Sequence, residues 1–181
     1  DFLPFCAAHI LPDKAQEARA FDLVRAFGAP YSVKMLEIDA VGMYDTAAEA
    51  MGKVFVTTEL GGGGTASART AGIALTGCRN LLIAAGILQG KLDARPTQWL
   101  DMPDGDCFTF SEDAGMIRFL ADLGERVEKG QVVAMIYPTG RTGLDPVELR
   151  ARRAGIFTAR HFPGLVKPGD CVAVIADEIA G

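Results

Sequence analysis

An internal repeat in the second half of the chain restricts the fold more than any other feature. The two copies begin at Ala114 and Ala154, and each runs through an Ala-Gly pair, a single glycine, a Val-x-x-Gly block and an apolar strand. The blocks keep their order at an offset of about 40 residues. The matched blocks are Ala114–Ile117 with Ala154–Phe157, Gly124 with Gly164, Val127–Gly130 with Val166–Gly169, and Val133–Ile136 with Val172–Ile175. Two hairpin units with one apolar face each can close on each other about a pseudo-twofold axis.

This repeat resembles the barrel-sandwich hybrid of biotinyl and lipoyl carrier domains. In those domains a lysine on the turn between the halves carries the cofactor. Here the turn is Tyr137–Asp145, which contains no lysine, and Arg141 cannot be acylated in its place. We therefore predict the small all-β fold for residues 101–181, without the carrier function.

The first hundred residues predict a different class, α/β. A helix is expected from Asp13, which can cap it, to Phe27, where Gly28 ends it. Further helices and strands alternate with it, as in a layered domain with a parallel or mixed sheet. The expected strands are residues 31–37 and 54–59, and the other expected helices are residues 46–51 and 67–88. The stretch 96–105 has a linker-like composition, so we place the domain boundary near residue 100, between domains 1–100 and 101–181.

Composition excludes several classes of protein. With 18 Lys and Arg against 23 Asp and Glu, the net charge is −5, and such a surface argues against nucleic acid as a partner. The four cysteines are scattered, which favours free thiols in a reducing compartment. The most apolar stretch, Ile73–Leu88, is interrupted by polar residues and glycine, so we expect no membrane span and a cytoplasmic location.

The segment Thr57–Gly64 carries the strongest chemical signal. It places Glu59 at the end of an apolar strand, directly before four glycines. In open α/β sheets ligands bind outside the carboxyl ends of the strands, where a glutamate with a raised pKa can act as a general base. Glycines would let a substrate approach closely. A phosphate loop is a weaker reading, because the GxxxxGK[ST] pattern is missing. A flexible turn with a solvated glutamate is the structural alternative.

The surrounding residues resemble a known family. The tyrosine loop Gly42–Ala48, followed by a small-residue helix and a strand ending in Glu-Leu, resembles the back half of the zinc carboxypeptidase-like fold. The closer resemblance is to the succinylglutamate desuccinylase/aspartoacylase family, in its N-acetyl-diaminobutyrate deacetylase branch of ectoine degradation. Asp1–Phe5, Thr57–Gly64 and Arg79–Leu82 carry this resemblance, together with the tyrosine loop.

The resemblance implies a zinc-dependent deacylase that hydrolyses the amide bond of a small N-acylated amino acid. Zinc in such enzymes activates a water molecule and polarises the carbonyl group. By resemblance Glu59 is the general base. Tyr44 and Arg69 can bind the substrate, Arg69 through a substrate carboxylate. A packed tyrosine and a solvated arginine are the structural alternatives for these two.

The chain departs from the family pattern at the metal ligands. The family binds zinc through a His-x-x-Glu pair and a later histidine, whereas His9 and His161 have no glutamate three residues on. The resemblance places all three ligands upstream of Asp1. We therefore expect the chain to be the C-terminal part of a longer enzyme, inactive alone. A metal-less regulatory or binding member of the fold is the alternative. His9 is expected to be structural or to line a pocket. The acyl group, the amino acid and any homo-oligomer stay open.

Overall fold

The computed structural model describes residues 1–36, 41–93 and 95–180. The chain divides into two compact units. One contains Pro4–Pro103 and the last residues from Ile179, and it holds all the α-helices among the described residues. The other contains Asp104–Glu178 and Asp1–Leu3, and it is built of strands and one short 3₁₀ turn at Gly105–Cys107.

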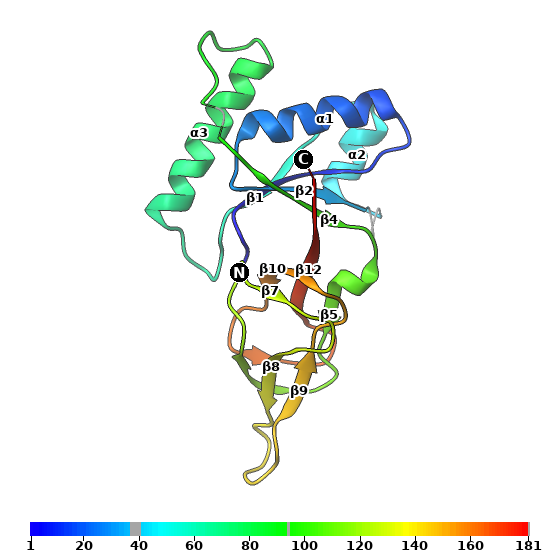
Figure 1. The fold of residues 1–181 in the computed structure, drawn as a ribbon, viewed down its shortest axis with the longest axis vertical. Helices are drawn as coiled ribbons and strands as arrows, with labels where there is room; N and C mark the ends of the chain where they lie inside the picture. The colour runs from blue at the N-terminus through cyan, green and yellow to red at the C-terminus, as the bar shows by residue number, and fades with distance from the viewer. Residues whose placement is uncertain (37–40, 94, 181) are drawn as a thin grey trace. The chain divides into compact units, whose positions relative to one another are not determined.

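The first unit is organised around a mixed sheet with the strand order β3-β1-β2-β4. Figure 1 labels three of these strands, β1, β2 and β4. β1 pairs in parallel with β2, and β2 with β4, whereas β3 runs antiparallel to β1. The strands are β1 (Phe5–His9), β2 (Tyr31–Met35), β3 (Thr57–Glu59) and β4 (Gln98–Met102). Every residue of β1 is buried, as is usual for a parallel strand covered on both faces.

Three helices belong to this unit: α1 (Lys14–Phe27), α2 (Tyr44–Ala50) and α3 (Ala68–Ala84). The Asp13 carboxylate caps α1 by accepting from two backbone amides of the first turn, and Gly28 ends the helix in a left-handed conformation with φ +73°. α1 packs against both β1 and α3. A Cβ atom on Gly77 of α3 would lie 2.3 Å from the Phe27 ring, so only glycine permits this helix–helix approach.

The α/β core lies between α1 and the sheet. Phe21 of α1 meets Trp99 of β4 edge to face, with ring centroids 6.0 Å apart. The other buried members are small or apolar, and they are Cys6, Ala8, Ala20, Val24, Phe27 and Ala29.

The second unit contains two four-stranded sheets. One pairs β7 (Arg126–Val127), β10 (Gly155–Arg160), β12 (Cys171–Ile179) and β5 (Phe108–Phe110) in that order, and the other pairs β11 (Leu165–Val166), β6 (Gly115–Phe119), β8 (Val132–Tyr137) and β9 (Val147–Arg150). Buried residues from both sheets form one core, with Val133, Ile136, Phe157, Val172 and Ile175 among its members.

The sequence repeat reappears as an exchange of short strands between the two sheets. β7 of the first copy pairs with β10 of the second, and β11 of the second pairs with β6 of the first. The linking hydrogen bonds join matched residues of the two copies, but they run in opposite directions. The Gly124 amide donates to the Phe157 carbonyl at 2.9 Å, and the Ile117 amide donates to the Gly164 carbonyl at 2.8 Å.

The Ala-Gly pairs of the repeat mark close backbone approaches. A Cβ atom on Gly115 would lie 2.3 Å from the carbonyl oxygen of Tyr137, and one on Gly155 would lie 2.3 Å from that of Ala176. No real Cβ atom occupies such a position. Both copies therefore need glycine at the same point, which explains why this block of the repeat is kept.

The α/β class and the expected helix over residues 13–27 are confirmed, but several boundaries were wrong. β1 was not predicted, and β4 falls in the stretch expected to be a linker. Only Thr57–Glu59 of the expected strand 54–59 is a strand, α3 ends at Ala84, and α2 begins at Tyr44. Buried parallel strands lack the polar–apolar alternation by which strands are usually found. Glu37, the last residue of the expected strand 31–37, lies outside the described residues. No helix in the described ranges is long and apolar enough to cross a membrane.

Candidate functional site

Glu59 lies at the amino-terminal edge of the parallel strands. It is the last residue of β3, and because β3 is antiparallel it pairs with Phe5, the first residue of β1. Phe5 in turn is aligned with Tyr31, and Tyr31 with Gln98, the first residues of β2 and β4. The expectation that Glu59 sits at the carboxyl ends of the parallel strands was therefore wrong, because it assumed that β3 runs in the same direction as its neighbour.

The Glu59 carboxylate is exposed at the end of its strand. The protein atoms around it nevertheless remove enough water for burial to raise the pKa of the carboxyl group above its ordinary value. No donor among the described residues forms a hydrogen bond with this carboxylate. The group is thus free to accept a proton, and it does so more readily than a fully solvated glutamate.

The glycine loop after Glu59 needs its glycines for conformational reasons. Gly61–Gly64 all have positive φ angles, between +67° and +122°, a region that other residues rarely adopt. Gly62 and Thr65 form an isolated bridge that closes the loop. α3 then begins with a capping box in which Ser67 and Thr70 bond to each other's backbone amides. A Cβ atom on Gly61 would touch the Thr70 methyl group at 3.4 Å, so the loop lies against the first turn of α3.

Tyr44 is the first residue of α2, and its side chain is 79% exposed. One edge of its ring meets Phe55, with the centroids 5.4 Å apart. The structure thus shows a tyrosine that packs on one side and presents its remaining surface to solvent. Both features are compatible with a residue that contacts a substrate.

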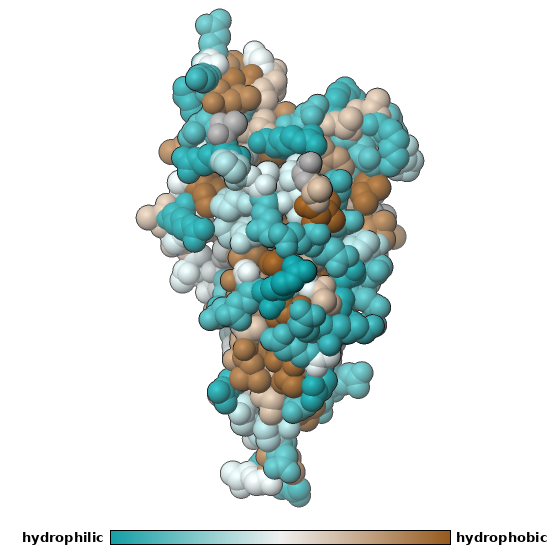
Figure 2. Space-filling model, viewed as in Figure 1, coloured by the Kyte–Doolittle hydropathy of each residue, from teal (hydrophilic) through white to brown (hydrophobic). Residues whose placement is uncertain are grey.

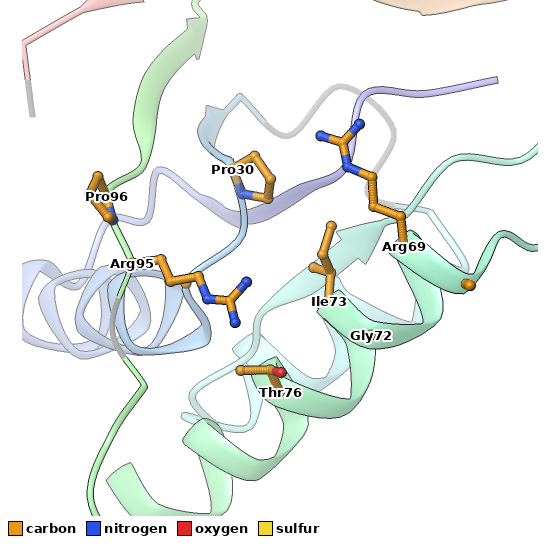
Figure 3. A pocket seen from close by; sticks show the side chains of 9 residues that line it. Pro30, Arg69, Gly72, Ile73, Thr76, Arg95 and Pro96 are labelled. Atoms are coloured by element: carbon orange, nitrogen blue, oxygen red, sulfur yellow. The ribbon is translucent and has the colours of Figure 1, made fainter.

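Arg69 lies in the first turn of α3 and lines a cavity of about 660 Å³ (Figure 3). One wall of the cavity comes from the segments that precede β2 and β4, and the other from the first turns of α3. Arg69 and Arg95 are its charged lining residues in the described part of the chain. Glu59 and Tyr44 do not line it, so the structure does not bring the three predicted site residues into one cavity.

His9 ends β1 and is buried against α2. Its Nδ1 atom lies 3.1 Å from both carboxylate oxygens of Glu49, and its Nε2 atom lies 3.9 Å from Asp45. The Gln16 side chain donates to the backbone carbonyls of Glu49 and Lys53 at 2.9 and 2.7 Å. His9 is therefore a structural residue that ties α2 to the sheet. In the second unit, the His161 ring donates a hydrogen bond from Nε2 to the Leu165 carbonyl oxygen, 3.1 Å away.

Sequence reasoning missed Arg95 and Glu49. Arg95 lies directly before the stretch taken as a linker, 26 positions after Arg69 in the chain. Glu49 lies 40 residues from His9. Arg95 and Arg69, like Glu49 and His9, are too far apart in the chain for a local motif to connect them. The sequence alone therefore gives no indication that the members of either pair lie near each other.

A zinc site needs three or four His, Cys, Asp or Glu side chains that converge on one point. Within residues 1–36, 41–93 and 95–180, no group of three His, Cys, Asp or Glu side chains is arranged to hold a metal ion. The described residues therefore do not fit a zinc site by themselves.

Comparison with known proteins places the chain in a family. The model of the succinylglutamate desuccinylase/aspartoacylase catalytic domain matches residues 1–85. A curated relative, the N-alpha-acetyl-L-2,4-diaminobutyric acid deacetylase of Halomonas elongata, is 45% identical over 181 residues, which are 99% of this chain and 53% of the relative. The chain belongs to the succinylglutamate desuccinylase/aspartoacylase family.

Solved structures of this family agree with that assignment. The product-bound ectoine utilization protein EutE (DoeB) from Ruegeria pomeroyi is 59% identical with a TM-score of 0.94, covering 98% of this chain and 54% of that one. A succinylglutamate desuccinylase from Silicibacter sp. TM1040 is 56% identical with a TM-score of 0.93, covering 99% and 54%. The chain thus spans about half the length of the family members it matches.

Proposed function

We propose that this chain belongs to an amidohydrolase that removes the acyl group from a small N-acylated amino acid, with Glu59 as the general base. The observation that carries the proposal is the Glu59 carboxyl group itself: its pKa is raised by burial, and it stands at a strand end before a glycine loop. The match of residues 1–85 to the family's catalytic domain supports the proposal. The name of the Halomonas elongata relative, a diaminobutyric acid deacetylase, points to N-acetyl-diaminobutyrate as the substrate.

In this proposal Glu59 moves a proton twice. Its carboxylate first accepts a proton from the attacking water and then returns it to the leaving amine. The raised pKa makes the Glu59 carboxylate a stronger base for the first of these two steps. Tyr44 donates a hydrogen bond to the substrate from its exposed hydroxyl group, and Arg69 pairs with the substrate carboxylate.

Zinc remains part of the proposal, although the described residues do not form a site for it. Its ligands would have to come from residues outside this chain, in keeping with relatives that are about twice as long. Glu59, Tyr44 and Arg69 can fill the roles proposed for them even if none of these 181 residues binds the zinc ion. The second candidate, a metal-less regulatory or binding member of the fold, is favoured by the same lack of a three-residue donor group in the described ranges.

The proposal also covers the fold of the second unit and the cellular location of the protein. The second unit is proposed to be a barrel-sandwich hybrid, supported by its two sheets and by the reciprocal pairing of β7 with β10 and β11 with β6. A cytoplasmic location is supported by four cysteines with free thiols.

The test uses the longer protein that contains this chain. Nα-acetyl-L-2,4-diaminobutyrate is supplied, and release of acetate is measured for the parent protein, for Glu59→Gln and for the exposed control Glu112→Gln. Loss of a general base should lower kcat by about 10²- to 10⁴-fold in Glu59→Gln, with the metal content unchanged. The control should match the parent. Near-parental turnover by Glu59→Gln would remove Glu59 from this role, and absence of bound metal from an inactive parent would favour the second candidate.

A further inference from the structure

The helix α2 has few features of its own that would stabilise it. It has seven residues, Tyr44–Ala50, and none of them is buried. Met43 at its start provides no side-chain cap, and its last turn contains no basic residue. A helix of this length is not stable in water by itself, because the cost of nucleation exceeds the stabilisation from so few hydrogen bonds. Contacts with the rest of the unit must therefore fix α2.

The side chain of Gln16 supplies two of these contacts. Gln16 lies in the first turn of α1, which runs beside α2 in Figure 1, and it is 6% exposed. Its Nε2 atom donates to the Glu49 carbonyl at 2.9 Å and to the Lys53 carbonyl at 2.7 Å. A carboxamide nitrogen carries two hydrogens, so both bonds can form together. Gln16 thus joins the last turn of α2 to the segment that leads to β3 and Glu59.

Glu49 is held at its side chain as well as at its backbone. The carboxylate oxygens lie 3.1 Å from Nδ1 of His9 on β1, while the carbonyl accepts from Gln16 on α1. The Gln16 side chain starts from a fixed point, because its backbone amide donates to the Asp13 carboxylate that caps α1, at 3.2 Å. Both β1 and α1 therefore bind α2 at one residue.

Tyr44 lies at the opposite end of α2 from this attachment. It precedes Glu49 by five residues, or about 7.5 Å along the helix axis, so a small tilt of α2 about Glu49 displaces the tyrosine. The Tyr44 ring meets Phe55 edge to face, and Phe55 follows Lys53 by two residues. Because Gln16 binds both Glu49 and Lys53, it sets the position of α2 relative to Phe55. The direction in which the tyrosine hydroxyl group is presented depends on that position.

We infer that Gln16 is a positioning residue for Tyr44. By binding the carbonyls on both sides of the turn after α2, it fixes where the tyrosine hydroxyl group is presented to the substrate, without touching the substrate itself. The inference rests on the proposed function for the contact between Tyr44 and the substrate, whereas the position of the tyrosine can be measured without turnover.

The kinetic test uses the longer protein that contains this chain, with Nα-acetyl-L-2,4-diaminobutyrate as the substrate. Gln16→Met keeps the length of the side chain and removes both donors, whereas Gln16→Glu places a negative charge beside the two carbonyl oxygens. We expect KM to rise about five- to tenfold in Gln16→Met, as for the loss of one hydrogen bond to the substrate, and further in Gln16→Glu. The value of kcat should stay within about twofold. Gln89→Met, at an exposed position of the same unit, is the matched control and should behave like the parent.

A double-mutant cycle separates positioning from general damage to the fold. Tyr44→Phe removes the hydroxyl group and keeps the ring that contacts Phe55. In the Tyr44→Phe background, Gln16→Met should change KM by less than about twofold, because the hydroxyl group through which it acts is gone. Effects of the two substitutions that multiply in KM, or an effect of Gln16→Met confined to kcat, would overturn the inference.

Fluorine NMR supplies a readout that does not need turnover. The protein is labelled with fluorotyrosine, and the resonance that disappears in Tyr44→Phe is assigned to Tyr44. Gln16→Met should shift or broaden this resonance, because the ring loses its fixed place against Phe55, and Gln89→Met should leave it unchanged. An unchanged Tyr44 resonance in Gln16→Met would count against the inference. A displaced resonance in a protein whose parent does not hydrolyse the substrate would contradict the proposed function and leave the positioning of Tyr44 standing.

Discussion

The imidazole of His9 faces the carboxylate of Glu49, with Nδ1 3.1 Å from each of its two oxygens. Both side chains are less than a tenth exposed. None of the residues of α2 is fully buried, so this helix has little apolar packing to fix it. Its position therefore depends on the polar contacts from His9 and Gln16. Tyr44 begins the same helix, which makes His9 an indirect determinant of where that tyrosine stands.

Substitution of His9 should loosen α2. His9→Ala leaves the Glu49 carboxylate buried without its partner, and the free energy of unfolding should fall by about 1.5–3 kcal/mol, as for hydrogen bonds to charged groups. Urea unfolding followed by circular dichroism measures this change. The exposed pair of Arg25 and Asp22 supplies the control, because Arg25→Ala should change stability by less than about 1 kcal/mol. Equal effects from the two variants would show that His9 does not hold the helix.

Glu59→Gln should make the chain more stable near neutral pH. Burial raises the pKa of Glu59 in the folded state above its ordinary value of 4.5. The folded state therefore favours the protonated form, and the stability contributed by this group is present below about pH 4.5 and is lost as pH rises through the folded-state pKa. Glutamine resembles the protonated form, so the gain over the parent should appear at about pH 7 and vanish at about pH 4. Urea unfolding at both pH values tests this, and a gain that is the same at both would contradict it.

Asn80 should be essential to the segment that leads to β4. Asn80→Ala removes both bonds to the Asp93 backbone inside the protein, and we expect stability to fall by about 1–3 kcal/mol. Arg79→Ala, at the preceding and exposed position of α3, should change stability by less than about 0.5 kcal/mol. Thermal unfolding of both variants distinguishes them. A small effect of Asn80→Ala would mean that this segment is held by other contacts.

The glycines of the repeat should resist substitution. Gly115→Ala would place a methyl group 2.3 Å from the Tyr137 carbonyl oxygen, so the strands must separate, at a cost of about 1–3 kcal/mol. Gly140→Ala is the control, because a Cβ atom there meets nothing within 4 Å. Denaturant unfolding of the two variants measures the difference. Equal stability would show that the two neighbouring strands, β6 and β8, adjust to a methyl group at this point without loss.

Figure 2 shows brown apolar side chains exposed among teal polar ones on the face in view. Leu75 and Ile87, 76% and 75% exposed, are the most exposed leucine and isoleucine side chains in the described ranges. Scattered exposed apolar residues are common on protein surfaces. They do not by themselves identify a partner.

The sequence alone determined the features that depend on neighbouring residues. The limits of α1 followed from Asp13 and Gly28, because a cap and a left-handed terminus are local requirements. The repeat located the glycines of the second unit, and the Glu-Leu-Gly run identified Glu59. These signals lie within a few residues or recur at a fixed period, so they can be read along the chain.

Tertiary structure decided which distant segments meet and in which direction they run. Because β3 pairs antiparallel with β1, Glu59 lies at the amino-terminal edge of the parallel strands and not at their carboxyl ends. The fold also brought Arg95 to Arg69 across one cavity and Glu49 to His9 across 40 residues. A local pattern indicates whether a residue prefers a strand or a helix. It does not indicate which strand will pair with that one, or in which direction the two strands will run. Long-range packing of the whole sheet sets these, and they fix where each side chain can act.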